Sequence, residues 1–289
     1  MRGLIPNPKS LIPSARRAAN GLMAALLAPS CAVCGVLLDE PLSGCVCKHC
    51  WRSILLITPP ICDTCGDPLA RQHQSLIPNP QSLAQRSRSL CAHCCSKRES
   101  AVDRARSIGE YEGALREIVH ALKYERRASL GRQLAALMRS RGAALLDETD
   151  CIVPVPLHWR REYQRGFNQA CEIARHLGRP VVDVLVRRRA TRAQVELAAD
   201  RRRDNVAGAF AVRRRWFRDR SIRGKKLLLV DDVSTTGATL EACARVLKEY
   251  GASEVYALTA ARVVTMRRHD PAVSQSLTPN PQPSPIPKP

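Results

Sequence analysis

The sequence predicts an α/β fold in which a parallel-sheet domain follows a small cysteine-rich module. Four Cys-x2-Cys pairs lie between residues 31 and 94. Further along the chain, the apolar run 227–230 predicts a buried strand, and an acidic pair, a loop of hydroxyl residues and a helical pattern follow it directly. A strand, a polar loop and a helix in this order place a ligand site at the carboxyl edge of a parallel sheet.

The composition is strongly basic. Lys and Arg number 46 against 26 Asp and Glu, which gives a formal net charge of +20. This balance indicates either a polyanionic partner or a solvated basic surface. The sequence contains no apolar run of about 18 residues, so we expect no membrane span.

Residues 1–30 are expected to combine a disordered tail with a short amphipathic helix. Arg16 and Arg17 precede an apolar run, Leu22–Ala28, which is similar to a short signal peptide. This run is at the lower limit of length for such a signal, and Pro29 follows it. We therefore predict an amphipathic helix over about residues 14–28, and a cytoplasmic protein.

A short Pro-rich phrase occurs three times, at residues 4–10, 75–83 and 276–282. Proline at alternate positions blocks both helix formation and sheet pairing. We expect all three copies to be disordered, the second as a low-complexity insert at 74–83 and the third within a Pro-rich tail at 269–289. A proline-rich docking peptide is the alternative interpretation.

The cysteine pairs predict two tetrahedral zinc sites within residues 31–98. The first two pairs are separated by 12 residues and the last two by 25, of which the insert accounts for ten. Such spacing is typical of zinc sites, and Gly35 and Gly66 provide the turns. A disulfide framework and thioredoxin-like redox chemistry are the alternatives. The expected ligands are Cys31, Cys34, Cys47 and Cys50 for one site, and Cys62, Cys65, Cys91 and Cys94 for the other.

Other cysteines and histidines are expected to have no ligand role. Because each site already has four thiolates, we place Cys45, Cys95, His49 and His93 at the surface. Apolar sequence contexts predict buried core thiols elsewhere in the chain, at Cys151, Cys171 and Cys243.

The second domain, residues 99–268, predicts alternating helices and strands. Its first helix has an apolar stripe at helical spacing, formed by Leu115, Ile118, Val119 and Leu122. Helices are expected at 111–124, at about 129–146 and at 238–250, and the loop 157–169 is expected to open a further helix that runs to 177–178. Strands are expected at 151–156, 181–186, 210–212, 227–230 and 254–263.

Two basic segments are expected near the carboxyl edge of the sheet. The loop 157–169 brings Arg160, Arg165 and Asn168 to this edge, where arginines suit a pyrophosphate. The segment 187–226 carries 15 Lys and Arg against 4 Asp and Glu, and we interpret it as a mobile flap or basic hood.

The loop after the strand 227–230 suits a phosphorylated sugar. Backbone N–H groups at a helix N-terminus attract phosphate, and glycine at position 237 permits close approach. Carboxylates bind phosphate poorly but accept hydrogen bonds from sugar hydroxyls, which suits Asp231 and Asp232. The expected phosphate-binding residues are Ser234, Thr235, Thr236, Gly237, Ala238 and Thr239.

Three different interpretations of the same loop compete with a sugar-phosphate site. A Walker-B strand would need an upstream G-x-x-x-x-G-K-[ST] loop, which the sequence lacks. A receiver-type acidic pocket would not need the Thr-Thr-Gly loop. In the third interpretation no ligand binds, and the acidic pair only caps the following helix.

This stretch resembles the 5-phosphoribosyl-1-pyrophosphate (PRPP) motif of type I phosphoribosyltransferases. The resemblance implies that Asp231 and Asp232 hold the ribose hydroxyls, that the loop 234–239 holds the 5′-phosphate, and that Mg2+ sits on the pyrophosphate. Over about residues 30–265 the chain resembles the ComF family, in which a double zinc ribbon precedes such a domain. The motifs that carry this resemblance are Tyr111-x-Gly113, Leu122-Lys123-Tyr124, Pro154-Val155-Pro156, Arg165-Gly166-Phe167-Asn168-Gln169, Thr191, Gln194, Arg202-x-x-Asn205 and Gly208-Ala209-Phe210.

The ComF resemblance implies a role in competence, the uptake of DNA for natural transformation; some members carry a gluconate-related (GntX-like) label. We expect a protein that binds PRPP and Mg2+ and assists incoming single-stranded DNA. Arginines beside an aromatic ring suit unpaired nucleic acid, which makes Arg213, Arg214, Arg215 and Trp216 the candidates for that contact. The alternatives are a nucleotide-salvage transferase that releases pyrophosphate, and a non-catalytic PRPP sensor.

Overall fold

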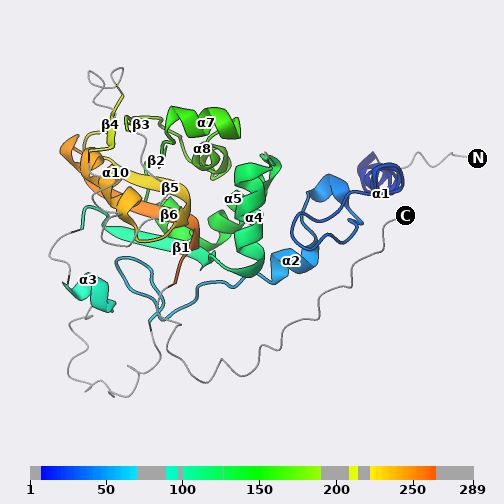
Figure 1. The fold of residues 1–289 in the computed structure, drawn as a ribbon, viewed down its shortest axis with the longest axis horizontal. Helices are drawn as coiled ribbons and strands as arrows, with labels where there is room; N and C mark the ends of the chain where they lie inside the picture. The colour runs from blue at the N-terminus through cyan, green and yellow to red at the C-terminus, as the bar shows by residue number, and fades with distance from the viewer. Residues whose placement is uncertain are drawn as a thin grey trace, which may run out of the picture.

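The computed structural model describes residues 8–69, 89–96, 100–125, 127–189, 208–213 and 222–264. Its centre is a four-stranded sheet in the order β1-β6-β5-β2, in which all the strands are parallel (Figure 1). The predicted parallel α/β sheet is therefore confirmed. The strands are β1 (Arg104–Glu110), β2 (Cys151–Pro154), β5 (Lys226–Ser234) and β6 (Glu254–Arg262).

The central strand β5 is buried on both faces, as a parallel sheet between layers of helices requires. Its residues 227–230 are fully buried. Leu228 and Val230 belong to one hydrophobic core, whereas Leu227 and Leu229 belong to a second. Successive side chains of a strand point to opposite faces, so the sheet separates the two cores.

Helices cover the two faces unequally. The first core packs against α4 (Gly113–Tyr124), α5 (Ser129–Arg141) and α6 (Ala143–Asp147), and the second packs against α10 (Ala238–Glu249). The predicted apolar stripe of α4 is fully buried, which confirms that helix. The helix predicted at 238–250 is confirmed as α10, and Gly251 follows it with a positive φ of 96°.

Two predicted helices are shorter than expected, and a glycine ends the first of them. Gly142 ends α5 where the chain lies against Leu258, and a Cβ there would be 2.8 Å from the Leu258 Cδ2 atom. The loop 157–169 contains a helix that the sequence pattern does not predict, α7 (Trp159–Arg165), which ends at Gly166 in the left-handed conformation (φ 82°). The next helix, α8, spans only Gln169–Ala174.

Two strand predictions also need correction. The strand predicted at 227–230 does not end before the acidic pair: β5 continues to Ser234 because β6 pairs with it as far as Arg262. The predicted strand 181–186 is reduced to one bridge between Val181 and Ile152, followed by β3 (Leu185–Arg187). The predicted strand 210–212 is confirmed as β4 (Phe210–Val212), which pairs with β3 as a separate antiparallel sheet.

The cysteine-rich module begins with α1 (Pro8–Leu27), which starts earlier than the predicted helix. Proline is tolerated in the first turn because its missing N–H would have no intrahelical partner. No helix among the described residues is both long enough and apolar enough to cross a membrane. The insert 74–83, the C-terminal tail and most of the basic segment 187–226 lie outside the described residues. Three short helices complete the module: η1 (Pro41–Ser43), α2 (Lys48–Arg52) and α3 (Ala92–Ser96).

The loop of the third Cys-x2-Cys pair, Cys62 and Cys65, packs directly on the edge strand β1. The Ala105 N–H donates to the Thr64 carbonyl (2.6 Å), and the Arg106 guanidinium donates to the Asp63 carbonyl (3.0 Å). Arg262 of β6 forms a 2.7 Å ion pair with Asp67. These contacts fix the cysteine loop against the sheet.

Replacing Gly66 with alanine is expected to destabilise this contact. Gly66 has a φ of 71°, and a Cβ there would lie 2.6 Å from the Ala105 backbone oxygen. The backbone conformation alone costs about 1–2 kcal/mol for a residue with a side chain, and the overlap is expected to add roughly 1–3 kcal/mol. Urea unfolding measures the loss.

Gly35→Ala is the matched control for this prediction. Gly35 has nearly the same φ, 72°, but its Cβ would meet no atom within 4 Å. The difference between the two variants therefore isolates the overlap with β1 from the backbone strain. Equal losses would show that the contact between Gly66 and Ala105 does not limit stability.

Candidate functional site

The two sets of cysteines form two compact clusters, with the Sγ atoms of each set within 4.8 Å of one another. In the first, the Cys31–Cys50 and Cys34–Cys47 sulfur pairs are 3.9 and 3.8 Å apart; in the second, the Cys65 and Cys91 sulfurs are 3.6 Å apart. A tetrahedral zinc ion with Zn–S bonds of about 2.3 Å separates its ligands by about 3.8 Å. The eight cysteines thus have the ligand type and spacing for two zinc sites.

In each cluster the surroundings favour a thiolate at one cysteine and oppose it at another, because burial raises the pKa of Cys65 to about 12 and raises that of Cys50 well above its ordinary value. Burial opposes ionisation of Cys31, but backbone N–H groups, including those of Cys47 and Val33, outweigh it and lower the pKa of this thiol to about 6. Burial likewise opposes ionisation of Cys62, and backbone N–H groups lower its pKa to about 7. Thiolates are the form that binds zinc.

The remaining cysteines and histidines largely match their predicted positions. His49, His93 and Cys95 are exposed, whereas Cys45 is half-buried and packs against the first core, contrary to the prediction of a surface position. Among the predicted core thiols, Cys151 and Cys243 are buried and Cys171 is only half-buried.

The acidic pair at the end of β5 is held by a lysine that sequence reasoning did not place in the site. The Lys123 Nζ atom of α4 lies 2.9 Å from the Asp232 Oδ1 atom, and their side chains are 15% and 10% exposed. Burial opposes the charge on Lys123, but Asp232 and then Asp231 outweigh it and raise its pKa. A lysine in the last turn of an otherwise apolar helix face is the sequence signal for this residue.

Asp231 has different surroundings from Asp232, because consecutive strand residues face opposite sides of the sheet. Burial, and next the charge of Asp232, raise the pKa of Asp231 to about 7, and the charges of Lys123 and Arg187 oppose this rise. The Asp231 carboxylate also accepts a 2.9 Å hydrogen bond from the Asp232 N–H. The two carboxylates are therefore linked but not equivalent.

The predicted phosphate loop joins β5 to the N-terminus of α10. Gly237 has a positive φ of 76°, and it lies directly before the first residue of the helix. The Thr236 hydroxyl accepts a 3.5 Å hydrogen bond from the Ala238 N–H. The Ser234 hydroxyl is buried and has no hydrogen-bond partner among the described residues. Backbone N–H groups at a helix N-terminus, together with a hydroxyl donor, suit an anion.

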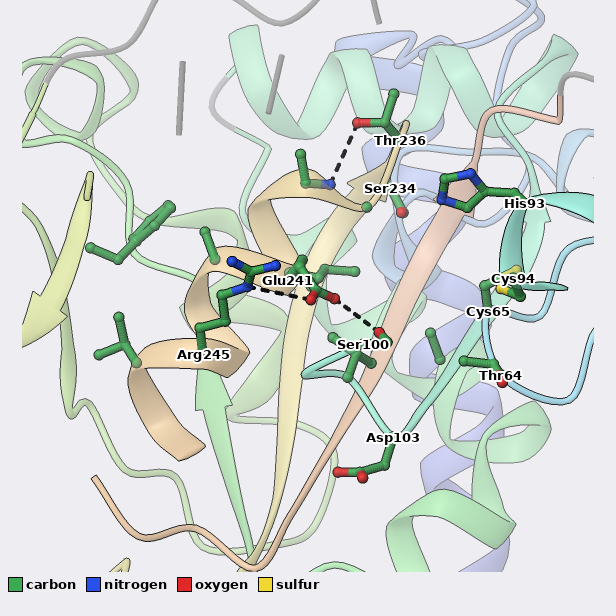
Figure 2. A pocket seen from close by; sticks show the side chains of 18 of the residues that line it. Thr64, Cys65, His93, Cys94, Ser100, Asp103, Ser234, Thr236, Glu241 and Arg245 are labelled. Atoms are coloured by element: carbon green, nitrogen blue, oxygen red, sulfur yellow. Dashed lines mark hydrogen bonds and ion pairs between the residues drawn. The ribbon is translucent and has the colours of Figure 1, made fainter. Parts of the chain in front are cut away.

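A cavity of about 740 Å³ opens beside this loop (Figure 2). Ser234 and Thr236 lie on one wall, and the second cysteine cluster contributes the other wall with Cys65, His93 and Cys94. Phe210 of β4 also lines it. The fold thus brings the second cluster, the strand β4 of the basic segment and the phosphate loop to a single cavity.

The predicted pyrophosphate residues lie on and after α7. The Arg160 guanidinium is over the Trp159 ring, and Arg165 donates a 2.9 Å hydrogen bond to Gln169. Asn168 is buried: its amide donates to the Val155 carbonyl (3.0 Å), and its oxygen accepts from the Ala170 N–H (2.9 Å), which caps α8.

The predicted nucleic-acid residues are only partly described. Arg213 follows β4 and forms a 3.1 Å ion pair with Asp183. Its guanidinium also donates to the Leu185 carbonyl (3.0 Å), so it braces the small β3–β4 sheet. Arg214, Arg215 and Trp216 lie outside the described residues.

A parallel sheet with an acidic pair and a Ser/Thr-Gly loop at its carboxyl edge defines a phosphoribosyltransferase-like domain, here with two four-cysteine clusters. Residues 164–276 match the phosphoribosyl transferase domain family. The chain is 31% identical to DNA utilization protein YhgH of Salmonella typhimurium over 70% of its own length and 96% of that protein. It is 31% identical to competence protein F of Haemophilus influenzae, over 73% of this chain and 87% of that protein. It is 29% identical to competence protein ComFC of Bacillus subtilis, over 70% of this chain and 84% of that protein. The chain belongs to the ComF family.

Proposed function

We propose that this protein binds PRPP at the carboxyl edge of its sheet and assists the uptake of single-stranded DNA. The observation that carries the PRPP proposal is the buried Ser234 hydroxyl, which has no hydrogen-bond partner among the described residues and lies at the end of β5, two residues after Asp232. The matched phosphoribosyl transferase domain and the names of the relatives support the two halves of the proposal.

Each part of the site has a distinct task in this proposal. The loop 234–239 binds the 5′-phosphate through backbone N–H groups and hydroxyls. Asp231 and Asp232 accept hydrogen bonds from the ribose hydroxyls, and Lys123 balances their charge when no sugar is bound. Arg160 and Arg165 are the proposed partners of the pyrophosphate. Mg2+, when bound with PRPP, would screen the pyrophosphate charge, and the two zinc ions would stabilise the cysteine loops.

Removing the acidic pair is expected to weaken PRPP binding. Asp231→Asn and Asp232→Asn each remove a charged acceptor, and each lost hydrogen bond is worth about 1.5–3 kcal/mol, or roughly 10- to 150-fold in Kd. Calorimetric titration with PRPP and Mg2+ measures the change. Asp147→Asn is the control, because this carboxylate is 80% exposed and lies far from the loop in the sequence. Parent-like affinity in the double variant would refute the ribose role.

A second candidate function is transfer of the ribosyl phosphate to an acceptor base. The cavity beside the loop favours it, because about 740 Å³ lined partly by Phe210 has room for a planar base. Release of pyrophosphate from PRPP and Mg2+, measured with free bases or single-stranded DNA as acceptors, tests this function. Pyrophosphate release with a free base would favour the transferase, and PRPP binding without release would favour a sensor.

A further inference from the structure

The cavity beside the phosphate loop is larger than a phosphate site needs. Its volume of about 740 Å³ lies in the range of pockets that hold whole small molecules, about 300–1,000 Å³. Ser234 lines it, is 4% exposed, and has a hydroxyl with no hydrogen-bond partner among the described residues. Because a buried polar group is normally satisfied, this hydroxyl points to a ligand, and the rest of that ligand has space beyond it.

The walls beyond the phosphate loop are partly apolar. Val102, Phe210 and Leu240 line the cavity from three different segments, and each is buried. Two charged residues of α10 that also line it pair with each other: the Arg245 guanidinium lies 3.5 Å from a Glu241 carboxylate oxygen. A sugar would bury hydroxyls against the apolar walls without partners, whereas the faces of a planar base are apolar and fit there.

The second cysteine cluster places an imidazole on the opposite wall. His93 lies on α3, directly before Cys94, and is exposed. Its ring points across the cavity toward Ser234 (Figure 2). The sulfurs of Cys65 and Cys91, 3.6 Å apart, join α3 to the cysteine loop that bonds to β1. The cluster therefore fixes His93 relative to the sheet, and an imidazole has the donor and the acceptor that the edge of a base requires.

We infer that the second cysteine module recognises the base of a nucleoside 5′-phosphate: His93 bonds to the edge of the base while the loop 234–239 holds the phosphate. This inference rests on the proposed function for the phosphate loop alone. It adds a recognition residue outside the stretch 164–276 that matches the phosphoribosyl transferase domain family. PRPP has no base, so His93 contacts the nucleotide and not PRPP. Because both ligands use the same loop, they compete.

The test compares ligands with and without a base. Calorimetric titration is carried out with AMP and UMP as purine and pyrimidine probes, with ribose 5-phosphate, and with PRPP and Mg2+. At least one nucleotide is expected to bind the parent more tightly than ribose 5-phosphate does, and to displace PRPP. His93→Ala is expected to weaken that nucleotide roughly 2- to 12-fold, the value of one neutral hydrogen bond, and to leave ribose 5-phosphate and PRPP unchanged.

The first cysteine cluster provides the matched control. His49 directly precedes Cys50, as His93 precedes Cys94, and it is likewise exposed on a five-residue helix. It does not line the cavity, so His49→Ala is expected to bind every ligand like the parent.

A second pair of variants tests the role of the cluster itself. Cys62→Ser is expected to lower the nucleotide affinity to that of ribose 5-phosphate, because α3 loses its attachment to the loop on β1. Retained binding of ribose 5-phosphate shows that the α/β domain of this variant is folded. Cys31→Ser, which breaks the other cluster, is expected to keep the nucleotide affinity of the parent.

The outcomes separate this inference from the proposed function. If the parent binds neither PRPP nor ribose 5-phosphate, the phosphate loop of the proposed function fails. If it binds both but shows no preference for a nucleotide, the inference fails alone. Parent-like nucleotide affinity in His93→Ala, an equal loss in His49→Ala, or a nucleotide that binds without displacing PRPP would also overturn it.

Discussion

Cys31→Ser is expected to remove one of two zinc ions and to unfold the first cysteine module. The segment that holds the first cluster is small, and chains below about 40 residues rarely fold without a metal or a disulfide. Structural zinc contributes roughly 10–16 kcal/mol of apparent binding free energy in comparable peptides, and this energy stabilises the fold. A serine hydroxyl cannot replace the thiolate of Cys31, which two backbone N–H groups orient in the cluster.

Mass spectrometry of the purified protein measures this loss. The parent is expected to carry two zinc ions, whereas Cys31→Ser and Cys62→Ser are each expected to carry one. Cys45→Ser is the matched control, because Cys45 lies in the same module but outside both clusters. Its zinc content is expected to equal that of the parent. A parent protein without zinc would refute both sites, and one with a single zinc would refute the second.

The loss of the first zinc is expected to remain local at first. The first module contacts the α/β domain through the 2.8 Å hydrogen bond from Gln133 to the Ser43 carbonyl, and through Cys31, Val46 and Cys50, which belong to the first hydrophobic core. The sheet does not include the cluster-bearing loops in its strand order, and the second core contains none of their residues. Limited proteolysis of Cys31→Ser is therefore expected to cleave within residues 29–53 before it cleaves the α/β domain.

Lys123→Met is expected to lower the free energy of unfolding by about 3–5 kcal/mol at pH 8, because it leaves a buried carboxylate without its cation. Lys123 and Asp232 are both largely buried and 2.9 Å apart, so solvent screens the pair weakly. Methionine keeps much of the volume and apolar contact of the lysine stem. Urea unfolding followed by circular dichroism measures the difference.

The loss in the free energy of unfolding that Lys123→Met causes, its deficit, is expected to grow with pH. The pKa of Asp231 is already raised to about 7, and Lys123 is one of the groups that oppose this rise, so removing Lys123 raises it further. When the pKa of a carboxyl is higher in the folded state than in the unfolded state, the protein loses stability as the pH rises from the unfolded-state pKa, near 4, through the folded-state pKa. At pH 5 Asp231 is largely protonated when folded, and the deficit is expected to be smaller than at pH 8.

A double-mutant cycle isolates the pair. Lys123→Met/Asp232→Asn removes both charges, and it is expected to recover much of the stability that Lys123→Met loses. Lys123→Arg keeps the charge and is expected to lie between the parent and Lys123→Met. Equal deficits at pH 5 and pH 8, together with additive effects in the cycle, would show that the charge of Lys123 does not hold the acidic pair.

Features that depend on residues close in the chain could be predicted from the sequence. The buried stripe of α4, the strand β5 and the helix α10 follow from apolar spacing, which local backbone geometry turns into a face. The cysteine clusters follow from the Cys-x2-Cys spacing, because a tight turn directs both thiols to the same point. The parallel sheet follows from the order of these elements along the chain.

Features that depend on long-range packing could be seen only in the tertiary structure. Strand β1 has few apolar residues, and it forms because β6 and the loop of Cys62 and Cys65 bond to its backbone. The pairing of Lys123 with Asp232, and the position of His93 beside Ser234 in one cavity, require the fold to bring remote segments together. No local pattern encodes these contacts, because the free energy of each depends on the burial and charge of a partner far away in the chain.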